Sequence, residues 1–372
     1  MAAPSETYVD PSINANSGTG TIGDPYGDLQ YALDTMTRDA TNGDRINIKS
    51  GTAEVLTGTL DFTSYGGTSR TARLTLEGYD STAGDGGIGE INGNNGNFSI
   101  TPTGNTNHAY KNLRCFNTGT AVVINLDNYA SIENCEVSQS TGGGVLGQRT
   151  ANVKNIDRCY FYDIAGHAVE NVGRVANSYF CNGTTNKFTQ CFKDGSTSNC
   201  QVVTNCLFNL DSTSTAIDSF GLFAVNNSIL GGNGSGSGID ATHSMLIHNN
   251  IIEDFNLGIV INNLDAAFVT HNAFFSNTTN ISYGSGADLI SGTDNETLSV
   301  SPFAKTGSLP TDFTSATFWS DLYAYFAPVD TGNVYSGYPT GSNQTKGAVG
   351  QPVGGGAGGG LLRVNMNGNV FG

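Results

Sequence analysis

Short, similar stretches recur through the middle of the chain, and this repeat constrains the fold more than any other feature. The stretches are IENCEVS, IDRCYFY, VANSYFC, VTNCLFN, VNNSILG, IHNNIIE and VTHNAFF, and they follow one another at intervals of 19 to 28 residues. A regular period is typical of a solenoid whose coils stack on their neighbours. A period near 22 residues predicts an all-β chain folded as a right-handed parallel β-helix, with like residues stacked about 4.8 Å apart. The leucine-rich repeat has a similar period, but its L-x-x-L-x-L-x-x-N framework does not recur.

Alignment of the stretches gives a row made mostly of Asn, which we expect at one bend of every coil. Asn tolerates left-handed backbone angles, and stacked amides can hydrogen-bond along a ladder. The members of this row are Arg114, Asn134, Arg158, Asn177, Asn205, Asn227, Asn250 and Asn272. The next position gives a row that we expect to point inward as small residues: Cys115, Cys135, Cys159, Ser178, Cys206, Ser228, Ile251 and Ala273. No C-x-x-C pair occurs among the seven cysteines, so buried, reduced thiols are expected rather than a zinc ribbon.

A second register of small residues runs between these stretches and carries the best candidate site. It consists of Ala121, Gly144, Ala168, Cys191, Ala216, Gly238 and Gly258. Two residues beyond each member stand Val123, Leu146, Glu170, Lys193, Asp218, Asp240 and Val260. We expect the four charged residues, Glu170, Lys193, Asp218 and Asp240, to form one outward column on successive coils, with His167 and His243 near its ends.

The column supports two kinds of chemistry. Asp218 and Asp240 on neighbouring coils would lie about 5 Å apart, a spacing that suits the two carboxylates of a glycosidase. The same acids could instead hold Ca²⁺, with Lys193 as the base of a polysaccharide lyase. Polar residues on the outside of a solenoid are also commonly no more than solvated, so a column without catalytic function is the plain alternative.

Both ends of a β-helix need covers, because they would otherwise expose core and strand edges. Near the start, Leu29, Ala32, Leu33 and Met36 have the spacing of an amphipathic helix, and Asp28 is placed to cap it. The sequence therefore divides into an N-terminal strand, loop and capping helix (1–50), the coils (51–297), an irregular C-terminal cap (298–353) and a Gly-rich tether with a docking peptide (354–372). We expect Trp319, the single Trp, to pack in the C-terminal cap, with stacking on a sugar as the alternative.

The opening YVDPSINANSGTGTIGDPYGDLQYALDTM, followed by GDRINIKSGTAEVL, resembles the start of pectate-lyase-like right-handed β-helix proteins. The segment from DFTSATFWSDLYAYF to TKGAVG resembles their closing segment, so the resemblance spans residues 7–350. It implies the fold but little about function, because lyases, hydrolases, epimerases, adhesins and bacteriophage structural proteins share this fold. The hydrolase motifs of the family are missing: no Asp-Asp pair occurs, and His167 in AGHAVEN lacks the second Gly of Gly-His-Gly. The Asp-Pro-His-Asp signature of its epimerases is missing as well.

The composition of the chain argues against several classes of partner. A net charge of −16 argues against nucleic acid as a ligand. No apolar run is long enough to span a membrane, and the five His have no metal-ligand spacing. The first residues lack the basic and apolar segments of a secretory signal, so synthesis in a host cytoplasm is expected.

The chain ends in a Gly-rich tether followed by a peptide rich in large apolar residues. The tether, residues 354–360, cannot pack, whereas the tip can dock on another chain by adding a strand to its sheet. The docking residues are Leu361, Leu362, Val364, Met366, Val370 and Phe371. We therefore expect a non-enzymatic structural protein of a bacteriophage virion, without a cofactor, anchored through this tail to other virion proteins or to further copies in a homo-oligomer such as a trimer. The alternatives are a tailspike-like polysaccharide lyase, with Ca²⁺ as its cofactor, or a glycoside hydrolase, and an adhesin that binds glycan without cleaving it.

Overall fold

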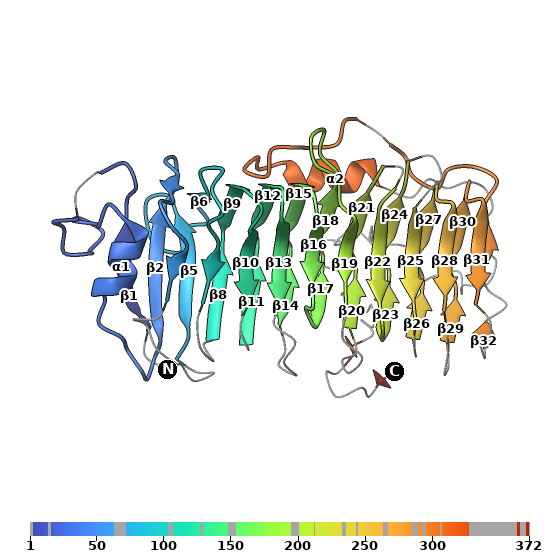
Figure 1. Cartoon of the computed structure of the whole chain (residues 1–372), viewed down its shortest axis with the longest axis horizontal. Helices are drawn as coiled ribbons and strands as arrows, with labels where there is room; N and C mark the ends of the chain where they lie inside the picture. Colours follow the sequence, from blue (N-terminus) through green and yellow to red (C-terminus); the bar gives the residue numbers. More distant parts are fainter. Residues whose placement is uncertain are drawn as a thin grey trace, which may run out of the picture.

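The structure of the chain is a computed structural model. It describes all residues except 1–2, 14–15, 63–71, 103–106, 127–128, 148–153, 195–200, 212, 233–235, 243–244, 263–266, 285–288, 292–294, 306, 327–362, 365–369 and 372. The described coils stack into one long solenoid whose sides are three parallel sheets (Figure 1). The fold class expected from the repeat is thereby confirmed.

Each complete coil passes through the three sheets in the same order, so we name them the first, second and third sheet. The first sheet holds β1 (Ser5–Val9), β2 (Asp44–Lys49), β5 (Leu74–Tyr79), β8 (Asn107–Lys111), β11 (Tyr129–Glu133), β14 (Asn155–Asp157), β17 (Arg174–Ala176), β20 (Gln201–Thr204), β23 (Leu222–Val225), β26 (Met245–His248), β29 (Ala267–Thr270) and β32 (Leu289–Ser291). The second sheet holds β3 (Glu54–Val55), β6 (Gly89–Asn92), β9 (Leu113–Thr118), β12 (Glu136–Ser140), β15 (Tyr160–Ile164), β18 (Tyr179–Cys181), β21 (Leu207–Asn209), β24 (Ser228–Leu230), β27 (Ile251–Glu253), β30 (Ala273–Phe275) and β33 (Glu296–Thr297). The third sheet holds β4 (Leu60–Asp61), β7 (Ile100–Thr101), β10 (Val122–Leu126), β13 (Gly143–Gly147), β16 (His167–Glu170), β19 (Gln190–Lys193), β22 (Thr215–Ser219), β25 (Ser237–Ala241), β28 (Leu257–Ile261) and β31 (Thr279–Tyr283).

The first sheet passes into the second through a bend at which one residue has a positive φ. The residues at this bend are Asn112, Asn134, Arg158, Asn177, Asn205, Asn226, Asn249 and His271, with φ between 50° and 58°. Asn predominates because it enters the left-handed region at low cost. Amides of successive coils are hydrogen-bonded, as between Asn134 Nδ2 and Asn112 Oδ1 at 2.8 Å.

The Asn row expected from the sequence was wrong at both ends, because it joins residues from different structural rows. Asn227, Asn250 and Asn272 lie one residue past the bend and point into the core, where they are fully buried. Arg114 lies two residues past the bend and pairs in register with Glu136 on the next coil. The expected inward row is also divided. Ser228, Ile251 and Ala273 follow the register of Tyr160 and Tyr179 in the second sheet.

The inward row changes its chemistry along the solenoid. Its earlier positions are Cys135, Cys159, Ser178 and Cys206, which are buried with free thiols at the three cysteines. Burial raises the pKa of Cys206 to about 12, so this thiol is protonated and inert. The later positions are Asn227, Asn250 and Asn272, and the side chains of Asn250 and Asn272 accept hydrogen bonds from the Asn of the preceding coil. Inside the second sheet, Phe161, Phe180 and Phe208 stack with ring centroids 4.8 Å apart.

The N-terminal end is covered by α1 (Leu29–Thr35), as the sequence predicted. Asp28 caps this helix by accepting a hydrogen bond from the backbone N–H of Tyr31 at 2.6 Å, and Leu29, Ala32 and Leu33 are buried against the first coils. The expected boundary at residue 51 falls inside the solenoid, because β1 and β2 already pair in parallel within the first sheet. These strands precede the repeats that were visible in the sequence.

The segment after β33 was expected to cover the end of the solenoid, but its helix lies along the side. Its helix α2 (Phe318–Tyr325) lies along the outer face of the second sheet, above β15, β18 and β21 (Figure 1). Phe318 packs on Tyr160 and Tyr179, with ring centroids at 5.0 and 6.4 Å. The outward positions of this sheet are apolar for several coils, so they require a cover and α2 supplies it.

The tail contains two short strands, β34 (Arg363–Val364) and β35 (Val370–Phe371), which pair with each other in antiparallel fashion. Of the expected docking residues, Val364, Val370 and Phe371 belong to these strands, and Leu361, Leu362 and Met366 lie outside the described residues. None of the helices that the structure describes is long and apolar enough to cross a membrane.

Candidate functional site

The four charged residues expected to form a column do stand next to one another on the third sheet. Glu170 pairs in register with Lys193, Lys193 with Asp218, and Asp218 with Asp240, on the successive strands β16, β19, β22 and β25. All four are half-buried, whereas the residues on either side of them in each strand that face the core are buried. We call these four residues the charged column.

Uncharged residues continue the column on both sides, and one of those expected from the sequence is wrong. Leu146 and Val260 lie where the sequence placed them, next to Glu170 and Asp240. Val123 does not belong to it, because the register of β10 places Asn125 beside Leu146. The small-residue row expected from the sequence includes Ala121, which lies two residues too early for that coil. The wrong alignment left the four charged residues unaffected.

Neighbouring polar side chains hold the column in place. Lys193 Nζ lies 3.2 Å from Nε2 of His167, which stands on the preceding strand β16. A protonated lysine can only donate, so Nε2 of His167 accepts and its proton is on Nδ1. Gln190 Nε2 donates to Asp218 Oδ2 at 2.5 Å, and Asn262 Nδ2 donates to Asp240 Oδ1 at 2.8 Å.

The environment makes both aspartates weaker acids than usual. Burial, followed by the charge of Asp240, raises the pKa of Asp218 to about 6, although the Lys193 ammonium lowers it. Burial also raises the pKa of Asp240, against the opposing effect of the Asn262 amide. Burial and then the Lys193 charge lower the pKa of His167, so this imidazole is neutral near pH 7. Both acids therefore keep their protons to a higher pH than an ordinary aspartate does.

Sequence reasoning missed three members of this site: Gln190, Asn262 and Asp194. Gln190 stands three residues before Lys193 and contacts the acid on the following strand rather than on its own coil. Asp194 is buried directly after Lys193, and its charge contributes to the raised pKa of Asp218. A search for polar residues adjacent to the column positions would have found Asp194, but the diagonal contact of Gln190 depends on the register between strands.

Calcium is the cofactor that a lyase at this column would need. Calcium takes six to eight oxygen ligands. Among the residues that the structure describes, no group of three or more His, Cys, Asp or Glu side chains is placed to hold a metal ion. The charged column by itself does not fit a calcium centre, and His243 lies outside the described residues.

The fold of this chain is shared with solved structures. The crystal structure of pectate lyase Pel9A superimposes with a TM-score of 0.56 and 13% identity over 94% of this chain and 96% of that chain. The protein has the pectate-lyase-like parallel β-helix fold. At this identity the likeness shows the fold alone.

Two further structures superimpose less well. ORF18 of Geobacillus virus E2 gives a TM-score of 0.48 at 12% identity over 78% of this chain and 60% of that chain. A mannuronic-acid-specific polysaccharide family 6 lyase from human gut microbiota gives a TM-score of 0.47 at 11% identity over 78% of each chain. No family model and no curated protein matches the sequence.

Proposed function

We propose that the outer face of the third sheet binds a glycan and that Asp218 and Asp240 hydrolyse one of its glycosidic bonds. The observation that carries this proposal is the register of the two acids on adjacent strands together with their raised pKa values. Adjacent parallel strands lie about 4.8 Å apart, and retaining glycosidases place their two carboxyl groups about 5–5.5 Å apart. The solenoid supplies this spacing through its backbone.

The two acids take different roles because their partners differ. Asp218, with a pKa of about 6, retains its proton in part near neutral pH and donates it to the glycosidic oxygen as the bond to the anomeric carbon breaks. Asp240 is hydrogen-bonded by the Asn262 amide, which favours its ionised form, so its carboxylate attacks the anomeric carbon. A water molecule then releases the glycosyl group, and Asp218 takes the proton of that water.

The charge of the face favours a neutral glycan. The charged column has three acidic residues, Glu170, Asp218 and Asp240, and one basic residue, Lys193. Because the acids outnumber the base, the face would repel an anionic glycan. The lyase proposed from the sequence would use Lys193 as its base and would need Ca²⁺ to offset this repulsion. Calcium-dependent release of unsaturated products would favour the lyase over the hydrolase.

The pKa values give the proposed hydrolase a defined pH dependence. Its rate should fall as pH rises through about 6, because Asp218 loses the proton that it donates. The rate should also fall at lower pH, because Asp240 becomes protonated and cannot attack. Lys193→Met should shift the fall in rate on the alkaline side of the pH–rate profile to higher pH, since the Lys193 charge lowers the pKa of Asp218. We would measure reducing-end release across pH for both proteins. If the substitution leaves the pH at which the rate falls on the alkaline side unchanged, the assignment to Asp218 is contradicted.

A second proposal, compatible with the first, is that the protein is a structural component of a bacteriophage virion anchored by its tail. Its support is the terminal hairpin of β34 and β35, which follows the Gly-rich stretch at residues 354–360. The edges of such a hairpin can pair with a further strand, and a Gly-rich sequence is typical of a linker to a docking segment. The partners would be other virion proteins or further copies of this chain in a homo-oligomer such as a trimer.

Removal of the tail tests this second proposal. Full-length protein should sediment with large particles from lysate of its source, and a form ending at Val353 should remain in the supernatant. The purified proteins should be compared in the same way, and a homo-oligomer that depends on the tail should dissociate on truncation. If both forms sediment alike in the two experiments, the anchoring role is wrong.

A further inference from the structure

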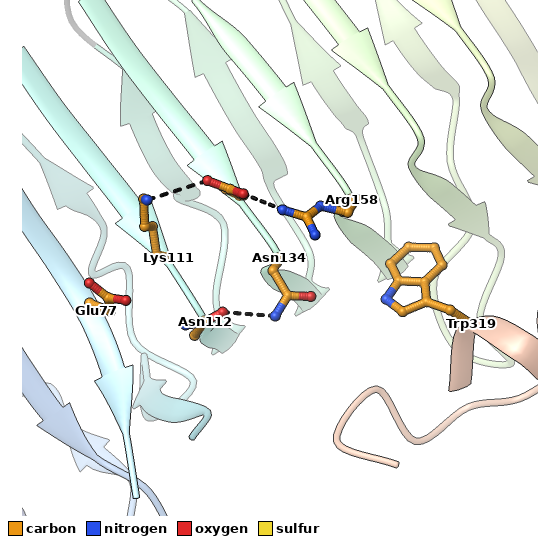
Figure 2. A pocket seen from close by; sticks show the side chains of 7 residues that line it. Glu77, Lys111, Asn112, Asn134, Arg158 and Trp319 are labelled. Atoms are coloured by element: carbon orange, nitrogen blue, oxygen red, sulfur yellow. Dashed lines mark hydrogen bonds and ion pairs between the residues drawn. The ribbon is translucent and has the colours of Figure 1, made fainter. Parts of the chain in front are cut away.

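A groove lies at the corner where the first sheet passes into the second, away from the charged column. Figure 2 shows the groove, which has a volume of about 240 Å³. Its lining consists of Glu77, Lys111, Asn112, Glu133, Asn134, Arg158 and Trp319. The first six residues belong to the coils, and Trp319 belongs to α2, so the groove exists only because α2 folds back along the second sheet.

Ion pairs organise the floor of the groove. Glu77, Lys111 and Glu133 occupy the same register position on successive strands of the first sheet. Lys111 Nζ lies 3.4 Å from Glu133 Oε2, and Arg158 also pairs with Glu133. The groove therefore offers donors and acceptors side by side, with two cations and two carboxylates in balance. Such a set suits a neutral ligand with many hydroxyl groups better than an anion.

Trp319 supplies a flat apolar wall. Its ring is held by Phe318 and Tyr323, with centroids at 5.2 and 6.2 Å. The side chain remains half-buried and faces the groove from the side opposite Lys111 (Figure 2). An aromatic ring with a fixed orientation beside polar groups is the usual arrangement for a ligand that has both an apolar face and hydroxyl groups.

Arg158 provides an independent indication that the groove has a function. It occupies the left-handed bend with a φ of 53°, where most other coils have Asn. This conformation costs an ordinary L-residue about 1–2 kcal/mol, and Asn least of all. The exposed ion pairs with Glu133 and Asp157 contribute too little to explain an arginine at this position. Unfavourable backbone conformations that persist cluster at functional sites.

We infer that this groove binds a neutral sugar residue of an oligosaccharide, which stacks on Trp319 and hydrogen-bonds to Arg158, Glu133 and Lys111. The site is separate from the charged column and does not depend on cleavage there. In a protein that acts on a glycan at the third sheet, it would be a second attachment point on a different face of the solenoid.

The single Trp of the chain makes this inference directly measurable, since tryptophan emission reports the groove alone. Titration with cellotetraose, maltotetraose or chitotetraose should change the emission of Trp319. The Asp218→Asn variant should show the same change in emission with the same affinity for the probe. Failure of cleavage at the column would thus leave this result intact. If none of the three probes changes the emission at millimolar concentration, or if tetragalacturonate binds in preference to all three, the inference is overturned.

Arg158→Asn separates a binding role from a structural one. The substitution restores the residue preferred at the bend, so the free energy of unfolding should stay the same or increase. Affinity for the sugar should nevertheless fall about 10- to 100-fold, because charged hydrogen bonds are lost. Lys187→Ala, which breaks an exposed ion pair with Asp211 elsewhere on the solenoid, is the matched control and should leave affinity unchanged. Equal affinity of Arg158→Asn and the unsubstituted protein would overturn the assignment.

Discussion

An Asp218→Asn substitution is expected to lower the rate of glycan hydrolysis about 10²- to 10⁴-fold, the range for loss of a general acid. The amide keeps the size of the carboxyl group and can still accept the hydrogen bond from Gln190, so the third sheet should fold normally. The N–H groups of the amide are far too weakly acidic to protonate the leaving oxygen. Asp240→Asn should reduce the rate to a similar extent, because the amide cannot attack the anomeric carbon.

Asp61→Asn is the matched control for both substitutions. Asp61 is an exposed acid on β4 of the same sheet and pairs with Thr101, which is hydrogen-bonded to Asn125 on the next strand. It lies several coils from Asp218, so its replacement should leave hydrolysis unchanged. Release of reducing ends from a panel of neutral polysaccharides measures the rate, and circular dichroism checks that each variant folds.

The outcomes separate a hydrolase from an adhesin. Full activity in both Asp218→Asn and Asp240→Asn would remove the charged column as the site of cleavage. Glycan binding that is unaffected by these substitutions, in a protein that cleaves no substrate, would identify an adhesin. Loss of cleavage in both variants with retention in Asp61→Asn would establish the pair as the catalytic carboxylates.

Asn250→Ala is expected to destabilise the solenoid by about 3–5 kcal/mol. Asn250 accepts hydrogen bonds from both the backbone and the side chain of Asn227, and donates to Asn272 Oδ1 and to the carbonyl of Ala224. All of these groups lie in the interior, where each buried polar group left without a partner costs about 1–3 kcal/mol. Alanine would remove the amide and leave several of its hydrogen-bond partners unpaired at once.

Urea unfolding followed by circular dichroism measures this effect. Asn125→Ala is the comparison, because Asn125 is a half-buried Asn on the outside of the third sheet with a hydrogen bond to Thr101 at 2.9 Å. Its loss should cost about 1 kcal/mol. Equal destabilisation by the two substitutions would show that the interior amides contribute no more than a surface hydrogen bond.

The sequence revealed the column because small residues mark the third sheet on nearly every coil. Small residues such as Ala168, Ala216 and Gly238 occupy these positions, and at Gly238 a Cβ would lie 2.5 Å from the carbonyl oxygen of Gly258 on the next coil. Their spacing fixes the residues two positions later. The Asn row was harder to read, because Asn serves two purposes. At Asn249 it accepts a left-handed bend, and at Asn250 it hydrogen-bonds inside the core. Adjacent Asn residues give the sequence no way to tell the two roles apart.

The position of α2 could not be predicted for a different reason. Its aromatic residues indicate only that it covers an apolar surface, and either the end of the solenoid or the outside of a sheet would serve. The outward-facing Tyr160 and Tyr179 decide between these surfaces, and their orientation depends on the register within the second sheet. The groove beside Trp319 was hidden for the same reason, since its two walls are far apart in the chain.

The placement of α2 also bears on how the solenoid opens. In a stack of coils, each coil can in principle detach from its neighbour, and opening can spread from either end. The apolar cluster formed with α2 and the segment before it, through Leu298, Phe303 and Phe313, includes residues of six consecutive coils: Tyr160, Tyr179, Leu207, Leu230, Ile251 and Ala273. Separation of these coils requires α2 and the residues packed beside it to leave the second sheet (Figure 1). The covered coils should therefore resist bending and exchange their amide hydrogens as one cooperative unit.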